Sequence, residues 1–390
     1  MPSRTVVIVV LVVVAVLVVG AVLLLSSGAS SSSSSSSSSY TGSTSSSSSS
    51  SSSTGSSSSS TGASSSATGT GSSGGALAQG MYVFHTTNAA MTQGAIARIS
   101  TVDASTQDLP ATLPTLSSAY TYPSHALVIS PAGDMYLASS EASKIYKIAA
   151  PGTGAATTFA DFSGAGLTPH KWSLAWDAAN SRLLAASGPR VFVVSSAGTI
   201  STAPGDQPTA STPIYTGVAV APGGGTLYLA TVDGNVYSYP LYSASSSSSS
   251  SGTAGGAPAT VLTGAPANCW DMAIDSAGTT LYLICTPAAG LVLVKQDLTS
   301  AGSAFASIAV PGASNAAGGI ASLVFDSRNS VTSGAAPVHV LYTMWRTATS
   351  DQSQFLTRLT VQPTTNQLVS ATNVDQNPIP PSFSYTPALF

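Results

Sequence analysis

Short apolar segments recur along residues 76–390 in one repeating order. The most regular of them is a short apolar segment with tyrosine in second place, and a copy without the tyrosine at 183–185 completes a series of six at intervals of about 44–60 residues. The five complete copies are 81–83, 135–137, 227–229, 281–283 and 341–343. Such short, evenly spaced apolar segments predict β-strands.

Two further kinds of segment accompany this series. A second apolar segment precedes five of the six copies, at 127–129, 174–176, 218–220, 272–274 and 323–325. The links between the two segments are turn-like, as in Ser-Pro-Ala-Gly-Asp at 130–134. An alternating segment follows each copy, at 95–99, 144–148, 190–194, 235–239, 291–295 and 355–359. A weaker fourth strand completes most units, so each unit is predicted to be a four-stranded antiparallel sheet.

Six such units predict an all-β fold, a six-bladed β-propeller over residues 81–390. A single blade cannot bury both of its faces, so neighbouring blades must stack and the ring must close. The first unit lacks its preceding segment, whereas residues 374–390 follow the last unit and end in an apolar stretch at 383–390. We therefore predict that this tail supplies the inner strand of the first blade.

The amino-terminal residues predict a membrane anchor. Residues 6–25 contain no charged side chain, and a helix of that length spans about 30 Å, the thickness of the hydrocarbon core of a bilayer. We predict a transmembrane signal anchor at 6–25, with residues 1–5 in the cytoplasm because of Arg4 and the rest of this single-pass protein outside the cell or on a virion surface. A cleaved signal peptide is the alternative.

Residues 26–80 form a stretch dominated by Ser, Thr and Gly. Such a composition has too few apolar side chains to offset the entropy of ordering, so we predict a disordered stalk. The stalk is either a plain spacer or a carrier of O-linked glycans. A second serine run at 245–251 is predicted to project from the ring as a loop.

The segment Leu-Val-Ile-Ser-Pro-Ala-Gly-Asp-Met-Tyr-Leu at 127–137, followed by Lys-Ile-Tyr-Lys-Ile at 144–148, resembles the six-bladed propellers of the NHL-repeat and SMP-30-like (strictosidine-synthase-like) group. The resemblance extends over the whole head at the level of fold. It implies an extracellular binding module, a lactone hydrolase or a condensing enzyme. The hydrolases of the group hold a divalent cation at the ring centre with a glutamate and other acidic or amide ligands. The corresponding strand starts of this chain carry no such set, which argues against that metal chemistry.

Charge and cysteine content exclude several functions. Only 6% of the residues are charged, with 11 Lys and Arg against 14 Asp and Glu, so the basic stripe of a nucleic-acid binder is missing. Two cysteines are too few for a four-cysteine zinc site. Cys269 and Cys285 flank one predicted hairpin within one or two residues of register, which leaves open either a disulfide or two buried thiols.

Candidate ligand contacts lie at or just before the starts of the inner strands, which we expect to surround an axial pocket. They are His125, His170, Lys171, Trp172, Thr216, Trp270 and Asp271. The tryptophans have an alternative role as wedges between blades, and His125 as a surface residue at a loop end. Asp177, Asp275 and Asp326 follow inner strands at equivalent positions, and we interpret them as caps of their own turns. No catalytic residue, metal ligand or cofactor is assigned.

Three functions remain in competition. The first is a membrane-anchored propeller that displays a binding face to a glycan or a protein. The second is an extracellular hydrolase resembling the lactonases, with its reaction at the axial pocket, and the third is a structural component of a surface coat. The first fits best, because few side chains of the head are suited to acid–base or metal chemistry.

Overall fold

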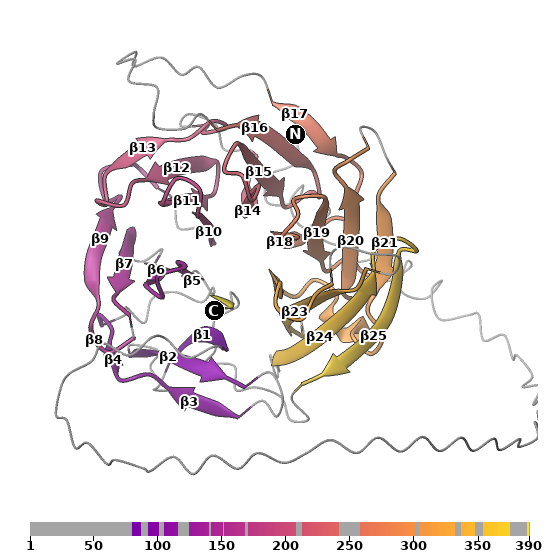
Figure 1. The fold of residues 1–390 in the computed structure, drawn as a ribbon, viewed down its shortest axis with the longest axis horizontal. Helices are drawn as coiled ribbons and strands as arrows, with labels where there is room; N and C mark the ends of the chain where they lie inside the picture. The colour runs from indigo at the N-terminus through magenta and orange to yellow at the C-terminus, as the bar shows by residue number, and fades with distance from the viewer. Residues whose placement is uncertain are drawn as a thin grey trace, which may run out of the picture. The chain divides into compact units, whose positions relative to one another are not determined.

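The computed structural model describes residues 80–86, 93–100, 105–115, 125–139, 142–150, 152–167, 171–207, 213–241, 258–300, 304–331, 337–347, 354–374 and 388–389. These residues form six four-stranded antiparallel sheets, which are the blades of a β-propeller. Figure 1 shows the blades following one another around the ring in the order of the sequence. The all-β, six-bladed fold predicted from the repeat is confirmed.

Within each blade the strands follow one another from the ring axis outward. From inner to outer strand, blade 1 contains β26 (Ala388–Leu389), β1 (Met81–Thr86), β2 (Gly94–Ile99) and β3 (Thr106–Asp108). Blade 2 contains β5 (His125–Ile129), β6 (Met135–Ser139), β7 (Lys144–Ile148) and β9 (Thr157–Asp161). Blade 3 contains β10 (Trp172–Asp177), β11 (Arg182–Ser187), β12 (Arg190–Val194) and β13 (Ile200–Thr202).

The second half of the ring repeats this order. Blade 4 contains β14 (Tyr215–Val220), β15 (Thr226–Thr231), β16 (Val236–Pro240) and β17 (Ala259–Leu262). Blade 5 contains β18 (Cys269–Ile274), β19 (Thr280–Cys285), β20 (Val292–Asp297) and β21 (Ala306–Ala309). Blade 6 contains β22 (Ala321–Phe325), β23 (His339–Arg346), β24 (Gln354–Gln362) and β25 (Gln367–Asn373).

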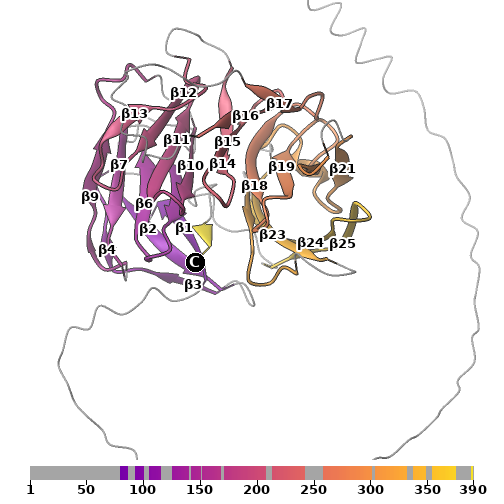
Figure 2. The ribbon, with the colours of Figure 1, turned by 45° about the horizontal axis from the view of Figure 1, so that its top comes forward.

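Smaller elements lie between the blades. A parallel pair, β4 (Ala111–Thr112) and β8 (Gly154–Ala155), links the segments that follow β3 and precede β9. A 3₁₀ turn, η1 (Ser314–Ala316), precedes β22. In Figure 2 the strands of blade 3 stand side by side, with β10 innermost and β13 outermost.

Both ends of the described chain meet in blade 1. β26 pairs antiparallel with β1, with Leu389 opposite Met81 and Ala388 opposite Tyr82. In Figure 1 the yellow carboxy-terminal strand accordingly lies beside the indigo β1. The prediction that the tail provides the missing inner strand is therefore confirmed. The ring is closed by hydrogen bonds between its two ends.

The hydrophobic core is divided among the six interfaces between neighbouring blades. Successive residues of a strand point to opposite faces of its sheet, so Leu183 packs against blade 2 while Leu184 packs against blade 4. Equivalent clusters fill the interfaces between blades 1 and 2, 4 and 5, 5 and 6, and 6 and 1. Burial of both faces of every blade explains why the second strands are apolar throughout rather than alternating.

The predicted anchor at 6–25 and the stalk lie outside the described residues, except for Gly80 at the end of the stalk. Within the part of the chain that is described, no helix has the length and apolar character needed to cross a membrane.

Candidate functional site

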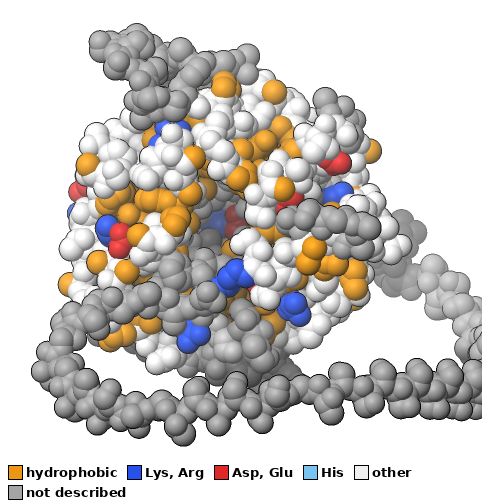
Figure 3. All heavy atoms as spheres, in the orientation of Figure 1, with side chains coloured by type: hydrophobic (Ala, Val, Ile, Leu, Met, Phe, Trp, Pro, Cys, Tyr) orange, Lys and Arg blue, Asp and Glu red, His pale blue; other side chains and the backbone are white. Residues whose placement is uncertain are grey.

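A pocket of about 560 Å³ lies on the ring axis. It is lined by the inner strands of blades 2 to 6 and by the turns that follow them, such as those at Pro131, Pro222 and Ser276. Its volume is within the range of small-ligand sites. Figure 3 shows the face of the ring hollowed at its centre.

Each inner strand of blades 2 to 6 ends in an apolar, half-buried residue that lines this pocket. In blade 3 this residue is followed by the turn aspartate, Asp177, which is still part of the strand. We call these five side chains the apolar rim: Ile129, Trp176, Val220, Ile274 and Phe325. Trp176 is stacked on Tyr136 of blade 2, with ring centroids 5.1 Å apart. The rim thus gives the pocket a mainly apolar wall with two aromatic rings.

Asp271 provides a carboxyl group deep in the pocket. It lies three residues before the rim residue of its strand, at a position that Ala126, Ser173, Gly217 and Ser322 occupy in the other described inner strands. In blade 3 the side chain at this position faces the backbone of the next blade: Ser173 Oγ accepts the Val218 N–H at 3.0 Å. Asp271 Oδ2 likewise accepts the Leu323 N–H at 3.1 Å.

The second oxygen of Asp271 bonds an amide that has no side-chain acceptor in blade 4. Gly217 faces the Met272 nitrogen, which a Cβ at Gly217 would approach to 3.0 Å, but glycine has no side chain that could accept the Met272 N–H. Asp271 Oδ1 accepts the Met272 N–H instead, at 2.9 Å. One carboxylate therefore receives two backbone donors and is fixed in position at the axis.

Lys171 reaches across the ring near Asp271. It directly precedes β10, and its ammonium donates a hydrogen bond to the Trp270 carbonyl on β18, two blades away. Burial lowers the pKa of Lys171 and raises the pKa of Asp271, and in each case the opposite charge of the other residue partly offsets this shift. Among the described residues neither side chain forms an ion pair within 4.0 Å.

Of the seven candidate contacts, Asp271 lines the pocket. Trp172 is fully buried against Phe162 between blades 2 and 3 and so takes the role of a wedge. Thr216 is buried and donates its hydroxyl hydrogen to the Cys269 carbonyl at 2.8 Å. Trp270 donates its indole N–H to Thr286 Oγ1 at 2.9 Å. These contacts hold neighbouring blades and strands together.

The two candidate histidines cannot be placed as ligand contacts. His125 begins β5, opposite Ser139 in the register, but only its backbone is described. His170 lies outside the described residues.

The structure joins Cys269 and Cys285 in a buried disulfide. The two residues are opposite each other in the register of β18 and β19.

The three turn aspartates act as caps, as predicted. Asp275 accepts the Thr279 N–H at 2.7 Å and the Thr280 N–H at 3.1 Å. Asp177 and Asp326 accept the backbone N–H three residues ahead in the same way. All three carboxylates are therefore engaged in their own turns, and of the three Asp275 lines the pocket. Within the described residues no group of three His, Cys, Asp or Glu side chains is arranged to hold a metal ion.

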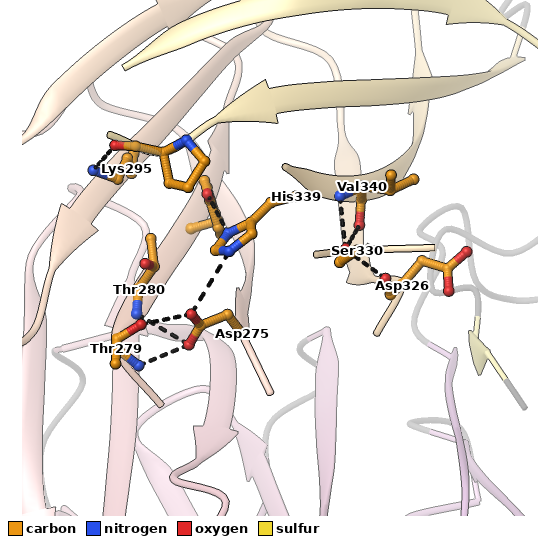
Figure 4. A network of polar contacts seen from close by, with 10 residues as sticks. Asp275, Thr279, Thr280, Lys295, Asp326, Ser330, His339 and Val340 are labelled. Carbon is orange, nitrogen blue, oxygen red and sulfur yellow. Dashed lines mark hydrogen bonds and ion pairs between the residues drawn. The ribbon is translucent and has the colours of Figure 1, made fainter. Parts of the chain in front are cut away.

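A buried polar network supports the rim between blades 5 and 6 (Figure 4). The pKa of Tyr282 is raised by burial, so Tyr282 stays protonated and donates its hydroxyl hydrogen to His339 Nδ1 at 2.8 Å. His339 Nε2, which we assign as the protonated nitrogen, lies 3.9 Å from Asp275 Oδ2. The imidazole also packs edge-on against the rim residue Phe325.

This network predicts a pH-dependent stability. Burial lowers the pKa of His339, with Asp275 opposing and Lys295 adding to the shift. The folded chain therefore binds a proton at this imidazole only at a lower pH than the unfolded chain, which does so below pH about 6.5. Stability should consequently be full above that pH and fall as the pH drops below it. Urea unfolding at several pH values measures this loss.

His339→Asn provides the comparison, because its amide oxygen can accept the Tyr282 hydrogen bond without titrating. The variant should lose less stability between pH 7 and 5 than the natural chain does. Equal losses in the two proteins would contradict the assignment of the pH dependence to His339.

The closed ring and its sheet order define the class of protein as a six-bladed β-propeller with an axial pocket. No protein-family model matches the sequence, and no curated protein matches it. Among solved structures, the chain is similar to a chain of a nidogen/laminin complex at 10% identity and a TM-score of 0.49, over 79% of this chain and 97% of that one.

Two bacterial structures give comparable alignments, each over 77% of this chain and 82% of the other. One is a putative 6-phosphogluconolactonase from Bacteroides uniformis, at 16% identity and a TM-score of 0.48. The other is a protein from Lactobacillus plantarum, at 14% identity and 0.46. The fold assignment rests on the sheet order and the inter-blade clusters. Membership of the NHL-repeat and SMP-30-like group beyond the fold stays a prediction.

Proposed function

We propose that this chain is a binding module, a β-propeller held outside the cell by the amino-terminal anchor and stalk, which takes part of a protein partner into its axial pocket. The observation that carries this proposal is the apolar rim. Five half-buried hydrophobic side chains gathered around one hollow are suited to an apolar group of another molecule.

Two features favour a protein over the other candidates. A glycan presents mainly hydroxyl groups, which the aliphatic side chains of the rim cannot satisfy. Hydrolysis of the lactonase kind needs several acidic or amide groups that act together on a substrate. The carboxyl groups of Asp177, Asp275 and Asp326 are bonded within their own turns, which leaves Asp271 as the single further carboxyl group among the described residues that line the pocket. The long Ser-rich segment after residues 6–25 suits a spacer that gives a large partner access to the ring.

Full-length protein in cells tests the proposal in two steps. A membrane-impermeant amine reagent should label the head on intact cells. Binding of extracellular proteins and glycans should then be measured on cells that carry the natural chain and on cells that carry Val220→Asp. This variant places a charge in the rim. The variant should lose roughly tenfold or more in binding to a protein partner.

Val369→Asp is the matched control, because Val369 is 61% exposed on the outer strand β25. It should bind as the natural chain does. Equal binding by both variants would exclude the axial pocket as the contact. Binding to glycans alone would overturn the choice of partner, and a head that is not labelled on intact cells would overturn the topology.

A further inference from the structure

The carboxyl group of Asp271 has unused capacity on the pocket side. Its residue is only 5% exposed, and no described cation forms an ion pair with it. Each carboxylate oxygen offers about two acceptor positions, and the Met272 and Leu323 amides use one on each oxygen. The remaining positions are available to a donor that enters from the pocket.

The walls above this carboxyl group suit an aliphatic chain. Val220 and Ile274 supply apolar contacts, and Trp176 and Phe325 add aromatic side chains. A buried carboxylate gains most from a ligand that brings both charge and hydrogen-bond donors. An ammonium group on an unbranched stem combines these properties, because its methylene groups can contact the apolar side chains of the rim while the ammonium binds the carboxylate of Asp271.

Lys171 does not occupy this place. It is not among the residues that line the pocket, and its ammonium is held by the Trp270 carbonyl. The pocket side of Asp271 is therefore open to a cation supplied by a ligand.

We propose that the axial pocket is a receptor for a primary amine on an aliphatic stem, and that the occupant is a lysine side chain of the protein partner with its ammonium group at Asp271. This inference rests on the function proposed above. It adds that the partner is recognised through one inserted lysine, rather than through an apolar surface alone.

Three four-carbon probes of similar size test the chemistry on the full chain in mild detergent. Calorimetric titration should give binding of n-butylammonium, roughly tenfold or more weaker binding of 1-butanol, and no detectable binding of butyrate. This order requires no variant, so it does not depend on the folding of a mutant. Binding of 1-butanol as tight as that of the amine would overturn the proposal, as would preferred binding of butyrate.

Asp271→Asn then identifies the group responsible. Butylammonium affinity should fall roughly tenfold or more, while the affinity for 1-butanol should change little. Asp161→Asn is the control, since Asp161 lies on the outer strand β9 with its side chain 44% exposed, and it should bind the amine normally. Undiminished amine binding by Asp271→Asn would overturn the assignment of the site.

A partner carrying a single lysine-to-glutamine substitution at its contact surface separates the two proposals. Loss of partner binding with that substitution supports the inserted lysine. Partner binding that depends on Val220 but on no lysine would overturn this inference and leave the proposed function standing. Amine binding by a chain that binds no protein would instead show a receptor for free amines and would overturn the proposed function.

Discussion

Replacing Cys269 and Cys285 together by alanine should lower the free energy of unfolding by about 3 kcal/mol. The disulfide closes a segment with a sequence separation of 16, and a loop of that length restricts the unfolded chain by about this amount. Both residues are fully buried between blades 4 and 5. Urea unfolding of the oxidised chain and of the double variant measures the difference.

Reduced natural protein is the control for this measurement. It should unfold close to the double variant, because both lack the cross-link while the rest of the interface is kept. The buried position also predicts that a thiol reductant acts slowly without denaturant. An unchanged unfolding midpoint in the double variant would show that the bridge adds no stability.

The sequence could not decide this pairing because of one irregularity in β18. Counting outward from the turn pairs Asp271 with Ile284, and a regular ladder would next place Trp270 opposite Cys285. The register shifts between Cys269 and Asp271, so that Cys269 lies opposite Cys285 instead. A bulge of one residue depends on packing against the neighbouring blade and leaves no local signal that distinguishes it from a regular strand.

The repeat was readable because each strand must bury both faces against its neighbours. That requirement produces apolar segments at constant intervals, and it made the tyrosine-free copy at 183–185 recognisable as part of β11. Ring closure was predictable from the same count, since an inner strand was missing before Met81 and a spare apolar segment remained at the end. The caps at Asp275 and its equivalents follow from chemistry within a few residues.

The position of the pocket was harder to predict. The sequence identifies inner strands but not the end at which the ring opens, because that depends on how the blades taper toward the axis. The predicted contacts therefore lie at the strand starts, whereas the pocket is lined from Asp271 towards the strand ends. One signal was available: an apolar residue directly precedes each turn aspartate, as Trp176 precedes Asp177.

Trp172→Ala should destabilise the fold strongly, by about 3–5 kcal/mol. The indole is 0% exposed and fills the interface of blades 2 and 3, with its ring centroid 5.2 Å from that of Phe162. It belongs to a buried cluster to which strands of both blades contribute, so the backbone cannot collapse into the space that alanine would leave. Chemical unfolding of the variant measures the loss.

Trp172→Phe separates this packing role from a polar one. Among the described residues the indole N–H has no hydrogen-bond partner, and a buried donor without a partner costs about 1–3 kcal/mol. Phenylalanine removes that cost while keeping most of the ring volume, so the two effects should nearly cancel and leave stability within about 1.5 kcal/mol of the natural chain. A loss as large as that of the alanine variant would imply that the indole nitrogen has a partner. Because the ring lies between blades and not in the axial pocket, the phenylalanine variant should also bind butylammonium with unchanged affinity.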